Sequence, residues 1–84
     1  MDIEERAETV SSREQFVAFL QAFEQDFRAY GANWENATLD SFVEALAAWT
    51  SVSDRYYANR GEQIANMSPW RIIADGFMAA RIYE

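Results

Sequence analysis

Residues 69–83 predict a helix whose circumference is apolar almost all the way round. Ser68 followed by Pro69 is typical of a helix start, because the serine can cap the first amides and proline lacks the amide that would remain unpaired. The polar side chains that interrupt the apolar surface are Arg71, Asp75 and Arg81. A helix of this kind lies at the centre of a fold or packs against another chain. The rest of the chain, or a second molecule, must therefore cover it.

Both interpretations of the 69–83 helix remain open in the sequence. In the first, the helix is sandwiched between the other helices of the same chain. In the second, it forms the seam of a homo-oligomer, where small side chains let a second helix approach closely. The residues of that candidate seam are Ile72, Gly76, Met78, Ala79 and Tyr83.

A second amphipathic helix is predicted at residues 12–30. Aromatic residues recur there at spacings of three and four, which gathers them within an arc of about 100°. These residues are Phe16, Phe19, Phe23, Phe27 and Tyr30. Ser11 and Glu14 match the S-x-x-E capping box of a helix start. Gly31 fits the left-handed position that often follows a helix end.

Residues 38–59 predict a third helix. Thr38 is a favourable N-cap, and the apolar residues after it keep a helical spacing to the end of the segment. Two serines shortly after Thr50 weaken the helix, so a kink or an end near that residue is an alternative. The unbroken phase of the apolar stripe favours continuation to residue 59, with Gly61 as the stop.

Together these patterns predict an all-α fold, because no segment shows the alternation of a strand. The expected architecture is a compact antiparallel three-helix bundle, with helices at about 12–30, 38–59 and 69–83. Residues 1–10 are acidic and are expected to form a flexible arm. Residues 11–84 are expected to form a single helical domain.

The composition excludes most of the common catalytic and metal chemistry. The 84 residues include no cysteine, histidine or lysine, which excludes thiol nucleophiles, imidazole bases, Schiff bases and Cys/His metal sites. The sequence also lacks a glycine-rich phosphate loop. We therefore expect no enzymatic activity, no metal ion and no cofactor.

The net charge of −7 indicates what kind of partner the chain can bind. An acidic surface repels nucleic-acid phosphates and anionic membranes, so neither is expected as a partner. The charge provides solubility, and it can also steer association with a basic protein. No apolar run has the length of a signal-peptide core or a membrane span, so we expect a cytoplasmic protein.

The candidate partner-binding residues fall in two stretches. An aromatic and three acidic side chains surround the start of the predicted 38–59 helix, and a tyrosine and an arginine lie near its end. The set is Trp34, Glu35, Asp40, Glu44, Tyr56 and Arg60. Trp34 has a structural alternative, in which it folds under its loop and closes one end of the bundle. The acidic group has an alternative too, as a solvated face without a partner.

Three segments resemble a family of small, all-helical bacterial proteins catalogued only as a domain of unknown function. They are "WENATLDSFVEALAAW" (34–49), "YYANRG" (56–61) and "SPWRIIADGFMAARIYE" (68–84). The resemblance implies a compact, helical, cytoplasmic domain with no established activity and no catalytic residue. In size and charge the chain is also similar to immunity proteins that block basic toxins, which is a likeness of bulk properties alone.

Three hypotheses of function follow. The leading one is a small acidic protein-interaction module, an adaptor or inhibitor without catalytic activity. The second is a structural homo-oligomer that packs through the 69–83 helix. The third is a small-ligand binder with Asp40, Glu44 or Asp75 as its polar groups.

Overall fold

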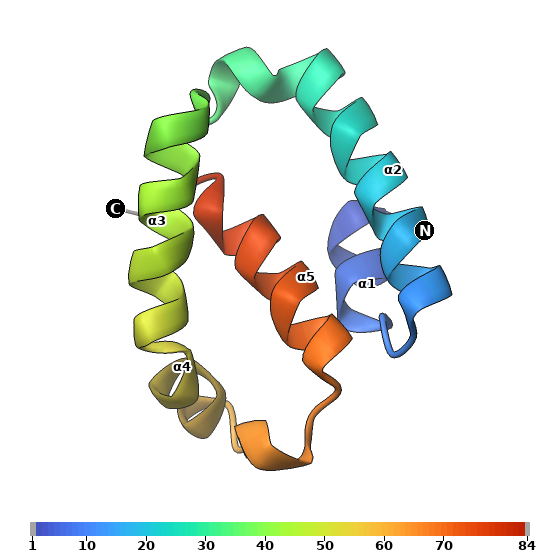
Figure 1. Ribbon diagram of the computed structural model, residues 1–84, viewed down its shortest axis with the longest axis vertical. Coiled ribbons are helices and arrows are strands. Elements are labelled where there is room, and N and C mark those ends of the chain that lie inside the picture. Colours follow the sequence, from blue (N-terminus) through green and yellow to red (C-terminus); the bar gives the residue numbers. More distant parts are fainter. Residues whose placement is uncertain (1, 84) are drawn as a thin grey trace.

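The fold is all-helical, as the sequence predicts. A computed structural model describes residues 2–83, and no strand occurs among them (Figure 1). The α-helices are α1 (Ile3–Glu8), α2 (Arg13–Tyr30), α3 (Leu39–Ser51), α4 (Ser53–Asn59) and α5 (Pro69–Ala80). Two short 3₁₀ turns, η1 (Gly31–Asn33) and η2 (Ile64–Asn66), lie in the connections.

Helix α5 is the centre of the molecule. It packs against α3 on one side and against α1 and α2 on the other (Figure 1). The approach of α3 depends on Gly76, because a Cβ there would lie 3.1 Å from Leu46 Cδ1 and 3.3 Å from the Trp49 ring. Ala74 and Ala80 of α5 are fully buried. The nearly apolar circumference of this helix is thus covered in large part by its own chain.

The expected three-helix bundle is replaced by a five-helix arrangement. Helices α2 and α3 are joined at one end through η1 and spread apart on either side of α5 (Figure 1). The predicted 38–59 helix is broken at Val52, which leaves the helical region with φ −117° and ψ 11°. The hydroxyls of Thr50, Ser51 and Ser53 each donate to a backbone carbonyl three or four residues earlier. Such bonds compete with the regular helix, so the break follows from them.

The expectation of a flexible arm at residues 1–10 is also wrong, because residues 3–8 form α1. Asp2 caps this helix, since its Oδ1 accepts a 2.8 Å hydrogen bond from the Glu5 amide. Ala7 and Val10 are each only 2% exposed and pack against Phe19 and Ala74. Burial contributes about 0.8 kcal/mol per CH₂ group, whereas ordering the backbone costs about 1–2 kcal/mol per residue. The burial of Ala7 and Val10 therefore offsets part of the cost of ordering this segment.

Three helix ends differ in detail from the expectations. The cap of α2 is Ser12, whose Oγ accepts from the Gln15 amide, while Gln15 Oε1 accepts from the Ser11 amide. The capping box therefore lies one residue later than predicted, with a glutamine in the place of the glutamate. Gly31 is not left-handed (φ −59°) but is needed for space, because a Cβ would overlap the Phe27 ring.

Helix α5 ends at Ala80 rather than at residue 83. Gly61 is left-handed as predicted, with φ 76°. A glycine is favoured there because other side chains are strained in this region.

Replacing Phe19 by alanine tests where the core lies. Phe19 is fully buried, so Phe19→Ala should lower the free energy of unfolding by about 3–5 kcal/mol. Phe27 lies two turns later on the same helix and is 45% exposed. The matched Phe27→Ala variant should lose only about 1–2 kcal/mol. Urea denaturation followed by circular dichroism measures both, and equal losses would contradict this location of the core.

Candidate functional site

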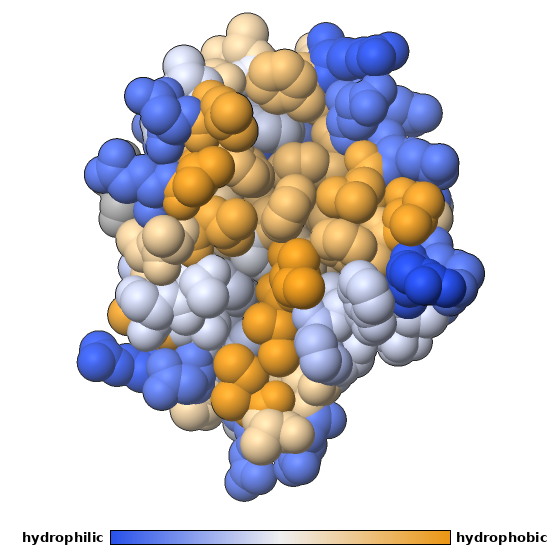
Figure 2. All heavy atoms as spheres, in the orientation of Figure 1, coloured by the Kyte–Doolittle hydropathy of each residue, from blue (hydrophilic) through white to orange (hydrophobic). Residues whose placement is uncertain are grey.

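One side of the molecule carries a broad uncovered apolar surface. Large apolar side chains on three helices are between 43% and 79% exposed. They are Val17 and Phe27 on α2, Leu39 and Val43 on α3, and Ile73 on α5. Figure 2 shows hydrophobic atoms gathered from α3 across α5 to α2. We call this surface the apolar face.

Helical spacing accounts for the alignment of these residues. On α2, Val17 and Phe27 lie ten residues apart, which places them about 80° apart around the helix, on neighbouring parts of its surface. On α3, Leu39 and Val43 are one turn apart, as are Ile73 and Phe77 on α5. Each helix thus contributes one apolar edge to the same face.

Aromatic rings packed edge to face form the floor between these edges. The Phe77 ring centroid lies 5.5 Å from that of Phe23 and 5.8 Å from that of Phe42, so α2, α3 and α5 meet through these rings. All three side chains are only partly buried. The Cα atoms extend only 17 Å along the shortest axis, too little for a further layer of helices. The described residues therefore leave these rings accessible from one side.

Trp34 lies at the η1 end of this aromatic floor. Its ring centroid is 5.1 Å from those of both Phe23 and Phe27, and the Arg81 guanidinium lies 5.8 Å above the ring. The side chain is partly exposed. Trp34 therefore closes one end of the fold, as in the structural alternative, and also presents part of its ring at the surface.

Asn36 is a structural residue whose role the sequence did not indicate. Its Nδ2 donates hydrogen bonds to the carbonyl oxygens of Ala80 (3.0 Å) and Tyr83 (2.7 Å), and its backbone amide donates to that of Arg81 (3.1 Å). These bonds satisfy carbonyls at the end of α5 that have no partner within the helix. Arg81 in turn pairs with Asp26 at 3.2 Å. The loop that carries Trp34 is thereby fixed to α5.

The predicted acidic residues lie beside the start of α3. Glu35, Asp40 and Glu44 are all exposed. Hydrogen bonds from the Thr38 hydroxyl and from the Ser41 amide lower the pKa of Asp40 and favour its ionised form. Helix α3 contains no basic residue, so Asp40 and Glu44 have no cationic partner within their own helix.

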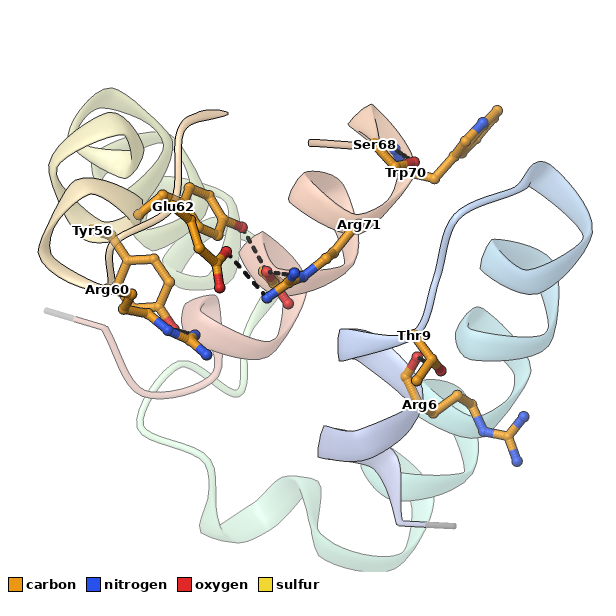
Figure 3. A network of polar contacts seen from close by, with 10 residues as sticks. Arg6, Thr9, Tyr56, Arg60, Glu62, Ser68, Trp70 and Arg71 are labelled. Carbon is orange, nitrogen blue, oxygen red and sulfur yellow. Dashed lines mark hydrogen bonds and ion pairs between the residues drawn. The ribbon is translucent and has the colours of Figure 1, made fainter. Parts of the chain in front are cut away.

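Tyr56 and Arg60 lie at a different place, on α4 and directly after its end. Arg60 Nη1 donates a 2.7 Å hydrogen bond to the Tyr56 hydroxyl, and its guanidinium lies 5.4 Å above the Tyr56 ring (Figure 3). That hydrogen bond raises the pKa of Arg60. Both side chains line an open groove of about 960 Å³ between α1, α4 and the end of α5. We call it the α1–α4 groove. The six predicted partner-binding residues are thus divided between two sites.

The predicted oligomer seam is also divided. Gly76 is buried against α3, and Ile72 is partly buried. Met78, Ala79 and Tyr83 line the α1–α4 groove together with Ile82. The α5 residues on the apolar face are instead Ile73 and Phe77, one helical position away from that set.

A polar network that the sequence did not indicate joins α4 to α5 (Figure 3). The Tyr57 hydroxyl donates a 2.6 Å hydrogen bond to Asp75 Oδ2, and Arg71 Nε lies 3.5 Å from the same oxygen. Arg71 also pairs with Glu62 at 3.5 Å. Arg71 Nε and Glu62 Oε2 are buried without a hydrogen bond to any described residue, so charge attraction alone holds this part of the network.

Burial is the main cause of the pKa shifts of Tyr57 and Asp75 in this network. It raises the pKa of Tyr57, and the hydrogen bond to Asp75 raises it further. Burial also raises the pKa of Asp75, while the Tyr57 hydroxyl and the Arg71 guanidinium oppose that shift. Tyr57 is fully buried, so the network connects helices in the interior.

Residues 2–83 contain neither a cluster of metal-binding side chains nor a membrane-spanning helix. No group of three or more carboxylates lies where it could hold a metal ion. Within the same part of the chain, no helix is both long and apolar enough to cross a membrane.

These features define a small all-helical domain with one uncovered apolar face. A family model described as "Family of unknown function (DUF7660)" matches residues 12–84, and the chain belongs to this family. Its membership in a family without a known function, expected from the segments at 34–49, 56–61 and 68–84, is confirmed. Comparison with curated proteins and with solved structures gave no match.

The buried carboxyl of Asp75 should make stability depend on pH. Its pKa is raised above the ordinary value of 3.8, so the folded state binds this proton more tightly than the unfolded state. The resulting stabilisation is complete below pH 3.8 and is lost as the pH rises through the raised pKa. The free energy of unfolding of the wild type, minus that of Asp75→Asn, should therefore fall as the pH rises. Urea denaturation at a series of pH values measures this difference.

Tyr57→Phe provides a second check on the same carboxyl. It removes a hydrogen bond that lowers the pKa of Asp75, so the fall in stability should move to higher pH. A difference between wild type and Asp75→Asn that is constant over the whole pH range would contradict the assignment.

Proposed function

We propose that the chain is a non-catalytic protein-binding module whose apolar face docks a basic, amphipathic helix of another protein. One observation carries the proposal. Five large apolar side chains stay 43–79% exposed on one side of three helices, in a chain that has a net charge of −7. Contiguous apolar patches on soluble proteins mark interaction sites.

The shape and composition of the face favour a helical partner. Helices α2 and α3 frame a floor of aromatic rings, and Trp34 lies at one end of it. Aromatic side chains are enriched among the residues that dominate binding energy. A partner helix with apolar residues along one side would cover these rings, as in other helix-in-groove complexes.

Charge favours a basic partner. The exposed carboxylates Asp40 and Glu44 lie on α3, which borders the face, Glu35 lies shortly before that helix, and α3 itself has no basic residue. Lysine and arginine at the margins of the partner helix would meet these groups and would accelerate association at low salt. A module of this kind acts as an adaptor or an inhibitor. The absence of cysteine suits the reducing cytoplasm, where we place its action.

A second copy of the chain is the alternative occupant of the same face. Ile73 and Phe77 of α5 would then lie in a homodimer interface. Self-association must overcome repulsion between two chains of charge −7, which is why we favour a basic partner. A small ligand in the α1–α4 groove is the third possibility, and the groove volume of about 960 Å³ supports it.

A matched pair of substitutions tests the proposal. Ile73 is 43% exposed on the apolar face, and Ile82 is 65% exposed in the α1–α4 groove. A basic protein captured by the wild type should be lost at high salt, because the charges are then screened. Its affinity, measured with the purified partner, should fall at least about tenfold with Ile73→Glu and stay unchanged with Ile82→Glu. If Ile82→Glu abolishes binding and Ile73→Glu does not, the binding site lies in the α1–α4 groove and not on the apolar face.

Sedimentation of the purified chain separates the two occupants of the apolar face. The proposal expects a monomer at concentrations of the order of 100 μM, because repulsion opposes a dimer. A dimer that Ile73→Glu disrupts and Ile82→Glu does not would instead assign the face to a second copy.

A further inference from the structure

The α1–α4 groove has two walls of opposite charge. Glu4 and Glu8, one turn apart on α1, line one side of it. Arg55 on α4 and Arg60 directly after that helix line the other side. Helix α5 lies between α1 and α4 (Figures 1 and 3). A molecule in the groove would therefore have carboxylates on one side and guanidinium groups on the other.

These four charged side chains form no ion pair within the described chain. All of them are exposed, and none takes part in the ion pairs found among residues 2–83. Two further charged side chains line the groove, but both have partners in the fold. Arg81 pairs with Asp26, and Asp75 accepts the hydrogen bond of the Tyr57 hydroxyl. The glutamates of α1 and the arginines of the opposite wall therefore keep their charges available to a ligand.

The two walls influence each other through space. The pKa of Arg60 is raised by its hydrogen bond to Tyr56 and, more weakly, by nearby carboxylates that include Glu8. Glu8 and Arg60 thus attract each other without forming an ion pair. An anion would be repelled by the wall of glutamates, and a cation would be repelled by the wall of arginines. A ligand with one positive and one negative end is attracted by both walls.

The floor of the groove between these walls is apolar. At the end of α5, Met78 and Ala79 are partly buried and Ile82 is 65% exposed. Tyr56 adds an aromatic ring beside the arginines, where it packs against Trp49 with the ring centroids 5.5 Å apart. The groove volume of about 960 Å³ is at the upper end of the range of small-molecule sites. The ligand should therefore be apolar between its charged ends.

The separation of the walls indicates the length of the ligand. An α-helix with its side chains is about 10–12 Å wide, and one such helix, α5, lies between α1 and α4. An extended peptide spans about 3.3–3.6 Å per residue, so a tripeptide reaches about 10 Å. Its ammonium and carboxylate groups would then reach opposite walls, while its side chains cover the floor.

We propose that the α1–α4 groove binds a short apolar peptide with both ends free, its ammonium group at Glu4 and Glu8 and its carboxylate at Arg55 and Arg60. Among the described residues, none of the five that define the apolar face lines this groove. Helix α1 lies behind α5 in Figure 1, whereas the apolar face of Figure 2 is on the near side. The peptide site and the proposed function can therefore fail separately.

Titration of the purified full chain with the tripeptide Leu-Ala-Leu tests the site. Backbone amide signals in NMR spectra should show saturable binding with a Kd below about 1 mM, which a ligand of this size can reach. The perturbed signals should map to α1, α4 and the end of α5. Binding that does not saturate by about 10 mM, or perturbations confined to the apolar face, would overturn the proposal.

Capping the ends of the peptide tests which wall each end meets. Acetylation of the amino end should weaken binding to the wild type at least about threefold, and it should have no effect on a variant with Glu4→Gln and Glu8→Gln. Amidation of the carboxyl end should weaken binding to the wild type by a similar factor, and it should have no effect on a variant with Arg55→Gln and Arg60→Gln. All four residues are exposed, so both variants should keep the fold. The opposite assignment of ends to walls would overturn the proposal.

Matched variants on α2 control for net charge. Glu14→Gln with Glu24→Gln, and Arg13→Gln with Arg28→Gln, remove the same charges from exposed positions that do not line the groove. Both should bind the free and the capped peptides as the wild type does. Equal effects of the α2 variants and the groove variants would show that net charge alone acts, and would overturn the proposal.

A polar peptide tests the apolar floor. Ser-Gly-Ser has the same free ends as Leu-Ala-Leu but no apolar side chain. It should bind at least about tenfold more weakly, because it leaves the floor in contact with water. Equal affinity of the two peptides would overturn the assignment of an apolar ligand.

Discussion

The burial of α5 is the constraint on which the rest of the structure depends. The helix is apolar on nearly all sides, and apolar surface left in contact with water makes the folded state less stable. The other helices are therefore arranged around it. Helix α3 approaches one side because Gly76 leaves room for Leu46 and Trp49. Helices α1 and α2 cover the opposite side. The buried Tyr57–Asp75 hydrogen bond then connects α4 to the same central helix.

The described helices do not cover α5 on all sides. Its accessible surface is 5600 Å², whereas a folded chain of 9.7 kDa is expected to expose about 5,100 Å². Part of the exposed surface lies where three helices meet through the partly buried rings of Phe23, Phe42 and Phe77. The apolar face is therefore the side of this arrangement that the described helices leave uncovered. A bound partner would supply the missing layer.

The two sides of α5 are covered in different ways, which bears on function. On one side the aromatic floor has no cover from the described chain. On the other side a short helix outside the family region fills a groove of the same apolar character. Both surfaces are apolar, and the apolar face is bordered by α3, which carries the exposed carboxylates Asp40 and Glu44 and no basic residue. Membership in a family without a known activity leaves these surfaces as the best guide to what the protein does.

The sequence by itself determined the all-α class, the helix start at Ser68 and Pro69 and the left-handed Gly61, whereas it left open whether the 69–83 helix is covered by its own chain or by another. These features depend on neighbours within one or two turns, so local patterns reveal them. Only the tertiary structure decided that residues 3–8 form a packed helix. Three apolar residues in an acidic segment are ordered in this way only where other helices offer a groove that buries them. It also decided the role of Asn36, whose partners lie more than forty residues away. The candidate residues were separated into two sites for the same reason: side chains that share a composition come together only where packing places them.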